Sequence, residues 1–512
     1  MDRETFAANA SHAETPWQIS PLFHRLFGRH MLNAALLVCL VAAFVGPINA
    51  KTELLNDPDI WWHLADARVM FSTHHAIQIE PYSFTVRGQR WIDPEWLSEV
   101  PYWIGYSSLG LVGINLAAFI AFSANLLFVY FRSASKSRHN GAAFWTAVLG
   151  FFLMAVNAGP RTIQFAYLAM SAEMLILDAA ENGKWRPLWL LPPLFCLWIN
   201  LHGSWVIGLG LLALYILCGL VPFNAGVFAQ DAFSRTDRNR LILVFMASVA
   251  ALFANPYGWR LVWNPFDMML NQKLIVAITQ EWHPLNLGAS AGMAAAVFIG
   301  LMIVANCVRG RKWKIYELAF ILFAWYVAFE HQRFAFMACI ITAPWLAVDL
   351  ARSFFPPSSE KTIPAFNALF VVGVACFVVF ILPSQTALQS GLSQRYPFHS
   401  IALIQPSWRT FNDHSLGGWM DFNSKPTFID SRNDTFEHHG VLQDYLAIQN
   451  LQDSSKLMDR YAVDHALIQA NTPLSFALEH SPSWRVEMQE GTGDNQYVLF
   501  AKTDGQPVDK AR

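Results

Sequence analysis

The feature that most constrains this chain is a series of long apolar runs, each close to the length that a helix needs to cross roughly 30 Å of hydrocarbon. Because the runs show no strict alternation of apolar and polar residues, they indicate helices and not a closed β-barrel. Hydrophobic residues make up 54% of the chain and charged residues only 14%. The sequence therefore predicts an all-α polytopic membrane protein with about eleven transmembrane helices. They are expected near 31–49, 109–131, 142–158, 163–180, 187–200, 203–221, 241–254, 289–308, 315–329, 334–350 and 364–383.

The charge of the connecting segments sets the expected orientation. Basic residues concentrate in alternate connections, and by the positive-inside rule these connections face the cytoplasm. We expect a cytoplasmic tail at 1–30, a transmembrane domain at 31–383 with a long outer loop at 50–108, and an extracytoplasmic domain at 384–512. The first run could also be a secretory signal, but its length favours an uncleaved span. The predicted location is a bacterial cytoplasmic (inner) membrane, with the C-terminal domain periplasmic or extracellular.

The composition of residues 384–512 is that of a soluble domain, with acids and bases interspersed and no run of membrane length. "KPTFIDS" (425–431) and "NQYVLFAK" (495–502) read as strands, because β-branched and aromatic residues lie between turn residues. "VLQDYLAIQNL" (441–451) and "SSKLMDRYA" (454–462) read as amphipathic helices. We therefore expect a small α/β domain here. All six cysteines lie in apolar runs, at spacings that suit neither disulfides nor a metal.

The stretch "NDPDIWWHLADARVMF" (56–71) comes shortly after the first apolar run and combines Asp57 and Asp59 with Trp61 and His63. The turn that Pro58 enforces could bring the two carboxylates together. A positioned carboxylate can act as a general base, so Asp57 and Asp59 are the catalytic candidates. They could also simply cap or solvate a helix end.

Further polar residues gather at the connections that are predicted to face outward, and polar groups beside a bilayer usually face a cavity or a partner. These candidates for substrate binding are Glu95, Arg161, Gln164, Asn200, His202, Glu281, His331 and Arg333, together with Trp61 and His63. Roles that need no substrate compete with this one. The arginines could reach lipid phosphates, and Asn200 and His202 could form hydrogen bonds with each other or with the backbone of their own turn.

Two other groups of charged residues can be explained by structural roles that need no substrate. Glu95 and Glu99 fit a solvated face of a short interfacial helix in "PEWLSEVPYWIGY". Asp430, Arg432 and Asp434 form a dense charged turn, which could touch an acceptor but more often is a surface cluster of ion pairs. No group of residues has a spacing typical of a zinc site.

An Asp-x-Asp directly after the first span, many further spans and an extracytoplasmic C-terminal domain resemble the GT-C membrane glycosyltransferases, which include protein mannosyltransferases and aminoarabinose transferases. "DPDIWWHLADARVM", "EWLSEVPYW", "RTIQFAYL", "LWINLHGSW" and "FIDSRND" resemble a bacterial branch of that group. The resemblance implies an inverting transfer of a sugar from a polyprenyl-phosphate-linked donor to a glycan, lipid or protein acceptor. Asp57 or Asp59 would be the base, with its neighbour orienting the acceptor or a divalent cation, and Arg161 and Arg333 would receive the phosphate.

Other functions fit parts of the same pattern. A transporter or flippase for a lipid-linked saccharide would also contain polar residues, although we would expect them at mid-membrane and on both faces. A non-catalytic scaffold for envelope assembly would leave Asp57 and Asp59 free to change. The chain has no glycine-rich phosphate loop, which favours a lipid donor over a nucleotide sugar, and nothing in it suggests a nucleic-acid partner.

Overall fold

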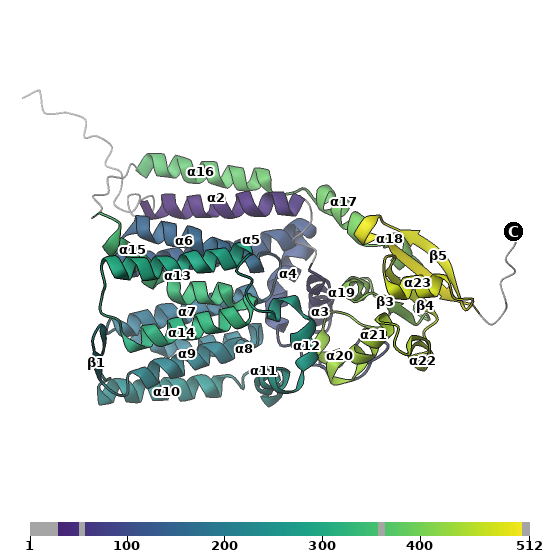
Figure 1. Cartoon of the computed structure of the whole chain (residues 1–512), viewed down its shortest axis with the longest axis horizontal. Coiled ribbons are helices and arrows are strands. Elements are labelled where there is room, and N and C mark those ends of the chain that lie inside the picture. Colours follow the sequence, from purple (N-terminus) through teal and green to yellow (C-terminus); the bar gives the residue numbers. More distant parts are fainter. Residues whose placement is uncertain (1–28, 51–56, 357–363, 504–512) are drawn as a thin grey trace, which may run out of the picture.

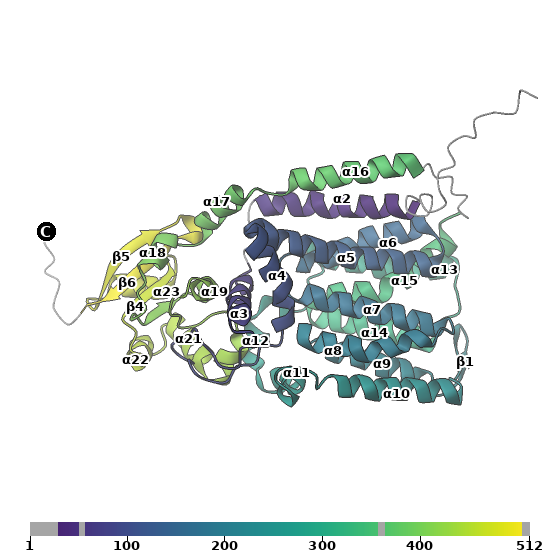
Figure 2. The same ribbon diagram turned by 180° about the vertical axis from the view of Figure 1, so that it is seen from behind.

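The computed structural model describes residues 29–50, 57–356 and 364–503, and most of the tail expected at 1–30 lies outside them. A helix occupies each of the expected apolar segments, and these helices run side by side as a bundle (Figures 1 and 2). They are α2 (Arg29–Ala50), α5 (Leu111–Ser137), α6 (Asn140–Met154), α7 (Ile163–Glu181), α8 (Leu191–Leu201), α9 (Trp205–Cys218), α10 (Arg235–Ala251), α13 (Ser290–Val308), α14 (Ile315–Glu330), α15 (Ala335–Ser353) and α16 (Pro364–Ile381).

The described helices confirm the membrane character. The helices α5, α7 and α13 and the segment Gln332–Ser353, which contains α15, are each long and apolar enough to cross a bilayer. Two other helices of the bundle, α6 and α9, are apolar but shorter. A span number of about eleven therefore stays a prediction.

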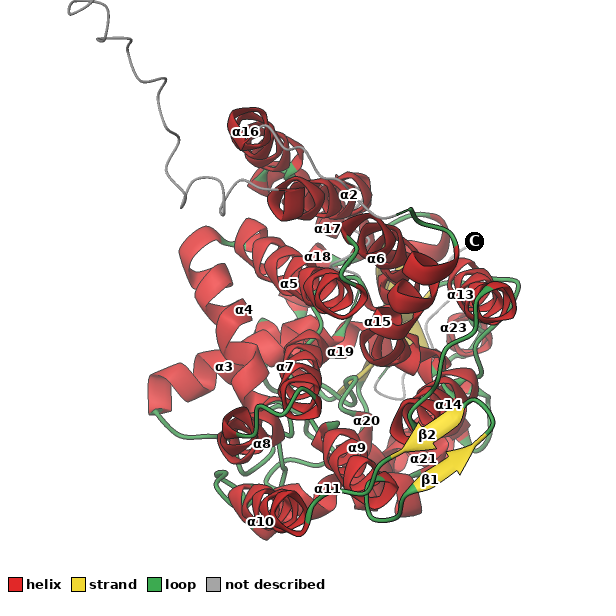
Figure 3. Cartoon of the chain, turned by 90° about the vertical axis from the view of Figure 1, so that its left-hand side faces the viewer, coloured by secondary structure: helices red, strands yellow, loops and turns green. Residues whose placement is uncertain are grey.

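The bundle is built around α15, which lies in its middle when the helices are viewed end-on (Figure 3). Small residues allow the helices to approach closely there. A Cβ added to Gly150 of α6 would come within 2.6 Å of the Cys339 Sγ atom of α15. Phe122, Phe151 and Phe336 fill the surrounding space.

Charged side chains at the end of the bundle away from the loop at 50–108 form ion pairs between helices. Arg132 of α5 pairs with Asp178 of α7, and Arg311 pairs with Asp349 of α15. In the sequence, the basic residues there indicated topology alone. The ion pairs tie neighbouring helices together, because a buried cation needs a partner.

The outer loop lies between the bundle and the C-terminal part of the chain (Figures 1 and 2). It contains α3 (Asp59–Thr73) and α4 (Trp96–Leu109), so "PEWLSEVPYWIGY" is largely helical as predicted. The helices α11 (Trp259–Asn271) and α12 (Lys273–Ile278) lie at the same end of the bundle. The outer connections therefore meet in one place.

The C-terminal part holds a four-stranded sheet in the order β3-β4-β6-β5, in which β3 is parallel to β4 and the other pairs are antiparallel. Its strands are β3 (Thr410–Asn412), β4 (His465–Gln469), β5 (Trp484–Glu490) and β6 (Tyr497–Lys502). Helices surround the sheet: α17 (Gln385–Arg395), α18 (Phe398–Leu403), α19 (His414–Phe422), α20 (Asn433–His438), α21 (Val441–Gln449), α22 (Ser454–Arg460) and α23 (Pro473–Glu479). The predicted helices in 441–451 and 454–462 and the predicted strand in 495–502 are confirmed.

The predicted strand at 425–431 is wrong. This segment forms only an isolated bridge between Thr427 and Ser83 of the outer loop, and the side chain of Asn412 accepts a hydrogen bond from the Phe428 backbone. Its apolar residues are buried because it is packed between the sheet and the outer loop. A segment that is buried from several sides needs apolar residues, and this apolar pattern resembles that of a strand.

Side chains of the outer loop also fix the C-terminal part to the bundle. The indole N–H of Trp61 donates to the Tyr396 hydroxyl at 2.9 Å, and the Trp61 ring packs edge-on against Trp419 at 4.3 Å between centroids. The backbone of α19 approaches α3 so closely that a Cβ on Gly418 would lie 2.5 Å from the Pro58 carbonyl oxygen. The C-terminal part is therefore packed tightly against the start of α3.

Candidate functional site

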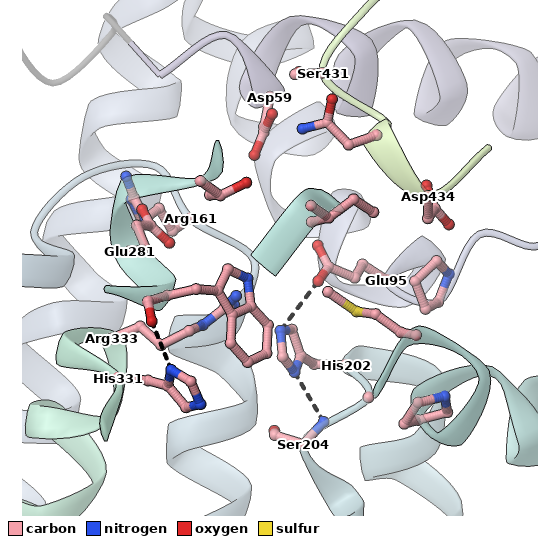
Figure 4. A pocket seen from close by; sticks show the side chains of 18 of the residues that line it. Asp59, Glu95, Arg161, His202, Ser204, Glu281, His331, Arg333, Ser431 and Asp434 are labelled. Carbon is pink, nitrogen blue, oxygen red and sulfur yellow. Dashed lines mark hydrogen bonds and ion pairs between the residues drawn. The ribbon is translucent and has the colours of Figure 1, made fainter. Parts of the chain in front are cut away.

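A cavity of about 1290 Å³ lies where the bundle, the outer loop and the C-terminal part meet (Figure 4). Its walls come from the starts of α3 and α4, from connections between bundle helices, and from the chain around residue 432. Most of the candidate residues line it, namely Asp57, Asp59, Glu95, Arg161, His202, Glu281, His331 and Arg333. Side chains from distant parts of the sequence are thus brought together.

The two candidate catalytic acids have different surroundings. The Asp57 Oδ1 atom accepts a hydrogen bond from the Asp59 backbone N–H at 3.1 Å, and its Oδ2 atom lies 3.0 Å from Nε of Arg161. Arg161 also pairs with Glu281 on its other side. The charge of Asp57 is therefore engaged by a cation.

The Asp59 carboxyl has no such cation in contact among the described residues. Burial raises its pKa to about 7, and the negative charge of Asp57 adds to this, against the lowering effects of the Ser431 hydroxyl and Arg161. The Trp62 indole N–H approaches Oδ1 of Asp59 at 3.4 Å. A carboxyl group with a pKa near neutrality is suited to exchange protons with a bound molecule.

Glu95 forms a second acidic centre of the cavity, on another side from Arg161 and Glu281 (Figure 4). The Ser204 backbone N–H donates to Nδ1 of His202 at 2.9 Å, which leaves the proton of the neutral ring on Nε2, 3.1 Å from Oε1 of Glu95. Burial raises the pKa of Glu95 to about 7 and lowers that of His202 to about 3. The expectation that Glu95 and Glu99 lie on a solvated face is wrong, because this helix is covered by the bundle and Glu99 is 0% exposed.

Arg333 is the cation best placed to receive an anion. Its guanidinium lies over the Trp282 ring, 4.7 Å from the centroid, and its Nε atom has no hydrogen-bond partner. Its backbone carbonyl accepts hydrogen bonds from Asn157 at 3.0 Å and from the Tyr167 hydroxyl at 2.9 Å, which fix the backbone. No acid among the described residues forms an ion pair with it.

His331 and Trp282 complete this side of the cavity. The Nδ1–H of His331 donates to the Trp282 carbonyl oxygen at 2.6 Å, so the imidazole is held in one orientation (Figure 4). The other ring nitrogen of His331 is then free to accept a hydrogen bond. The side chain lines the cavity.

Four other candidates do not line the cavity. Trp61 is 0% exposed and packs against the C-terminal part, and Gln164 is buried, donating to the carbonyl oxygens of residues 157 and 159. Asn200 accepts a hydrogen bond from the Trp96 indole at 2.9 Å. His63 lies behind the wall, with Nδ1 2.9 Å from Glu99 and Nε2 3.5 Å from Glu95. The geometry therefore gives these residues a supporting position and no direct contact with the cavity.

The segment 430–434 belongs to the site, although its sequence suggested a surface cluster. Arg432 is only 3% exposed and pairs with Asp430 and with Glu80 of the outer loop, so the expectation of a surface cluster is wrong. Ser431, Arg432, Asn433 and Asp434 line the cavity, and burial raises the pKa of Asp434 to about 6. The motif "FIDSRND" drew attention to this segment in the sequence as part of the family resemblance. The burial of the segment could not be predicted, because it depends on contacts with residues about 350 positions earlier, as in the Arg432–Glu80 pair.

One side of the cavity is apolar and extends between two bundle helices. Val206, Ile207 and Gly210 of α9 line it together with Phe323, Tyr326 and Val327 of α14. Tyr326 is 66% exposed in the chain, so this side opens toward the surroundings of the bundle. The cavity thus combines a polar end at the outer loop with an apolar branch.

The fold has likenesses among solved structures. The chain matches an Archaeoglobus fulgidus oligosaccharyltransferase tethered with an acceptor peptide containing the NVT sequon, at 11% identity and a TM-score of 0.55, over 94% of this chain and 75% of that one. The apo form of that enzyme matches at 12% identity and a TM-score of 0.51, over 85% of this chain and 69% of that one. ArnT from Cupriavidus metallidurans bound to undecaprenyl phosphate matches at 14% identity and a TM-score of 0.48, over 92% of this chain and 98% of that one.

Comparison of sequences gives no match, since neither a family model nor a curated protein matches the chain. The structural likeness to the oligosaccharyltransferase covers most of both chains at low identity, and it shows a shared fold. This likeness agrees with the fold that the sequence resemblance implied, and it shows the fold alone. The activity of this chain has to be inferred from its cavity.

Proposed function

We propose that this protein is a membrane glycosyltransferase that moves a sugar from a polyprenyl-phosphate-linked donor to an acceptor. The observation that carries the proposal is the cavity itself, in which Asp59 and the unpaired guanidinium of Arg333 share one space with an apolar branch between α9 and α14. A base, an anion site and a place for a lipid chain are the three parts that such a transfer requires.

Asp59 acts as the general base. Its ionised carboxylate takes the proton of the acceptor hydroxyl or amide while the acceptor atom attacks the anomeric carbon. The bond from that carbon to the phosphate oxygen breaks as the new bond forms, so the configuration inverts. Asp57 forms an ion pair with Arg161, and its negative charge helps to raise the pKa of Asp59.

The departing phosphate receives the donors of Arg333. A guanidinium offers two parallel N–H groups to phosphate oxygens, and partial burial strengthens this interaction. His331 lines the same part of the cavity, and its second ring nitrogen can accept one further hydrogen bond from a bound molecule. Arg161 is held by Asp57 and Glu281, so we assign it a role in positioning these acids.

The apolar branch between α9 and α14 takes the first isoprene units of the donor. It is lined by Ile207 and Val327, among others. Apart from the backbone of its own helix and its chain neighbours, no atom of the described residues lies within 4 Å of where a Cβ on Gly210 would project. A prenyl chain could thus remain in the lipid while its phosphate reaches Arg333. This arrangement favours a lipid-linked donor.

The acceptor enters from the C-terminal part, where Ser431, Asn433 and Asp434 face the cavity. The oligosaccharyltransferase that shares this fold has been seen with a tethered acceptor peptide. For this chain we propose a glycan, lipid or protein acceptor at the outer face of a bacterial cytoplasmic membrane. That orientation follows from the distribution of basic residues.

A flippase remains the competing function, and one feature of the bundle bears on it. Glu173 of α7 is buried with both carboxyl oxygens unpartnered, although the acids of the cavity and of the ion pairs lie near the two ends of the bundle. An ionisable group within a membrane helix can mark a transport pathway. Measuring transfer and transport separately distinguishes the two functions.

The test is a transfer assay with the purified full-length protein and a panel of polyprenyl-phosphate sugars. Transfer by the wild type that is lost in Asp59→Asn and Arg333→Gln supports the proposal. Asp494→Asn is the matched control, because this aspartate of the C-terminal part is exposed and does not line the cavity. Movement of the intact donor across vesicles without transfer, or equal transfer by Asp59→Asn, would refute it.

A further inference from the structure

Behind the cavity wall, three carboxyl groups meet in the protein interior. Asp66 lies in α3, Asp93 in the turn before α4 and Glu99 in α4, and each is at most 1% exposed. One ligand oxygen from each lies within 4.8 Å of the others. None of the three lines the cavity, so this cluster is separate from the proposed site of transfer.

Two of these carboxyl groups hold the cavity wall with one oxygen and leave the other oxygen unused. The Asp93 Oδ1 atom accepts the backbone N–H of Glu95 at 2.9 Å, and Oε1 of Glu99 lies 2.9 Å from Nδ1 of His63. Among the described residues, Oδ2 of Asp93, Oε2 of Glu99 and both oxygens of Asp66 have no hydrogen-bond partner of ordinary geometry. The Tyr82 hydroxyl lies close enough to Asp66 to influence its pKa, and Asp93 and Glu99 influence each other in the same way. Buried acceptors without partners are rare because each loses its hydration without replacement.

The nearest guanidinium, that of Arg432, compensates for this cluster only in part, through its charge near Asp66 and Asp93. Arg432 is engaged by Glu80 and Asp430, and its Nη2 atom lies 3.9 Å from Asp421. Among the described residues it forms no ion pair with the three acids. Burial raises the pKa of all three, that of Asp93 to about 7, because three charges cannot remain close together in the interior without compensation.

We propose that Asp66, Asp93 and Glu99 bind a divalent cation that prefers oxygen ligands, of the size of Mn²⁺ or Ca²⁺. Carboxylate oxygens are the ligands that such ions select, and an ion with bonds of about 2.3 to 2.6 Å joins oxygens up to roughly 5 Å apart. The ion would tie α3 to the start of α4. Through Asp93 and Glu99 it would hold Glu95 and His63 in place.

This inference goes beyond the proposed transfer and does not depend on it, because the ion is structural. The test uses the full-length protein in detergent, depleted with a chelator, at fixed pH and ionic strength. Bound Mn²⁺ is counted by electron paramagnetic resonance, and the Tm is followed during a Ca²⁺ titration. We expect one tightly bound Mn²⁺ per chain and a saturable rise in Tm.

Substitutions then assign the ion to the cluster. Asp66→Asn and Glu99→Gln each remove a ligand, and we expect Mn²⁺ affinity to fall by more than about tenfold, since even outer-shell changes weaken metal sites that much. Glu281→Gln is the matched control, because it removes an acid of the cavity and should leave Mn²⁺ binding unchanged. Gel filtration establishes that each variant is folded, and the two ligand variants serve as independent checks.

Two outcomes would overturn the inference. The first is a wild-type protein that shows no saturable Mn²⁺ binding and no Ca²⁺-dependent change in Tm, in which case protons neutralise the cluster. The second is binding that survives both Asp66→Asn and Glu99→Gln, which would place the ion elsewhere.

Discussion

The Nε atom of Arg161 lies 3.0 Å from Oδ2 of Asp57, and this ion pair distinguishes two acids that are only two residues apart in the chain. Asp57 is held by a cation, while Asp59 points into the cavity with a pKa raised to about 7. The structure thus assigns different surroundings to residues that the sequence presents as equivalent. The proposal gives the task of the base to Asp59.

The pH dependence of transfer depends on that raised pKa. Below about pH 7 the Asp59 carboxyl holds a proton and cannot accept another, so kcat/KM should rise with pH and level off above about pH 8. Asp57→Asn removes the negative charge that helps to raise this pKa, and its profile should shift to lower pH. A profile that falls between pH 6 and 8, or one that Asp57→Asn leaves in place, contradicts this prediction.

Stability should respond to pH in the opposite sense. Between the ordinary aspartate value of 3.8 and about 7, folded chains keep a proton on Asp59 that unfolded chains have lost, so rising pH through this window lowers the free energy of unfolding. Asp59→Asn removes this penalty. We expect its Tm at pH 8 to exceed that of the wild type by on the order of 1–3 °C, with little difference near pH 3. A lower Tm at pH 8 would show that the carboxylate stabilises the fold.

Arg161 and Arg333, which both line the cavity, should differ in their effect on donor binding. Arg333→Gln removes the unpaired guanidinium, and we expect KM for the donor to rise or kcat to fall by about 100-fold or more. Arg161→Gln leaves two acids without their cation, so it should disturb the pH profile more than the affinity for polyprenyl phosphate. Binding of polyprenyl phosphate alone, measured by calorimetry, separates these effects. Equal loss of affinity in both variants would contradict the division of roles.

The apolar branch predicts a dependence on the length of the lipid. Gly210→Trp should fill the space between α9 and α14, since a side chain there meets nothing within 4 Å at its Cβ. We expect about a tenfold or greater loss of activity with a donor of undecaprenyl length and a smaller loss with a geranyl-phosphate sugar. Gly300→Trp of α13 is the control, because that glycine also has open space and does not line the cavity. Uniform loss with both donors would place the prenyl chain elsewhere.

The helices, and the end of the bundle at which the long loop and the C-terminal part lie, could be predicted because hydropathy and basic charge are local properties of the sequence. Which side chains reach the cavity could not, because direction depends on packing. Trp61 and Trp62 are adjacent, yet Trp62 lines the cavity and Trp61 packs on Tyr396. Successive residues of a helix project about 100° apart, so neither composition nor spacing distinguishes them.

Burial of charge was the second feature that the sequence did not reveal. Arg432 and Glu99 look like solvated residues when only their neighbours in the sequence are considered. Both are buried because residues 80–99 of the outer loop lie between the bundle and the C-terminal part. The pKa shifts at Asp59, Glu95 and Asp434 arise from the same packing.

The central claim is that Asp59 is the base and Asp57 a positioning residue. The most direct test compares kcat of Asp57→Asn and Asp59→Asn, each at its optimal pH, with a saturating lipid-linked donor. We predict that Asp59→Asn lowers kcat by about 100- to 10,000-fold, and Asp57→Asn by less than about 30-fold. The reverse order, or near-wild-type turnover in Asp59→Asn, would contradict it.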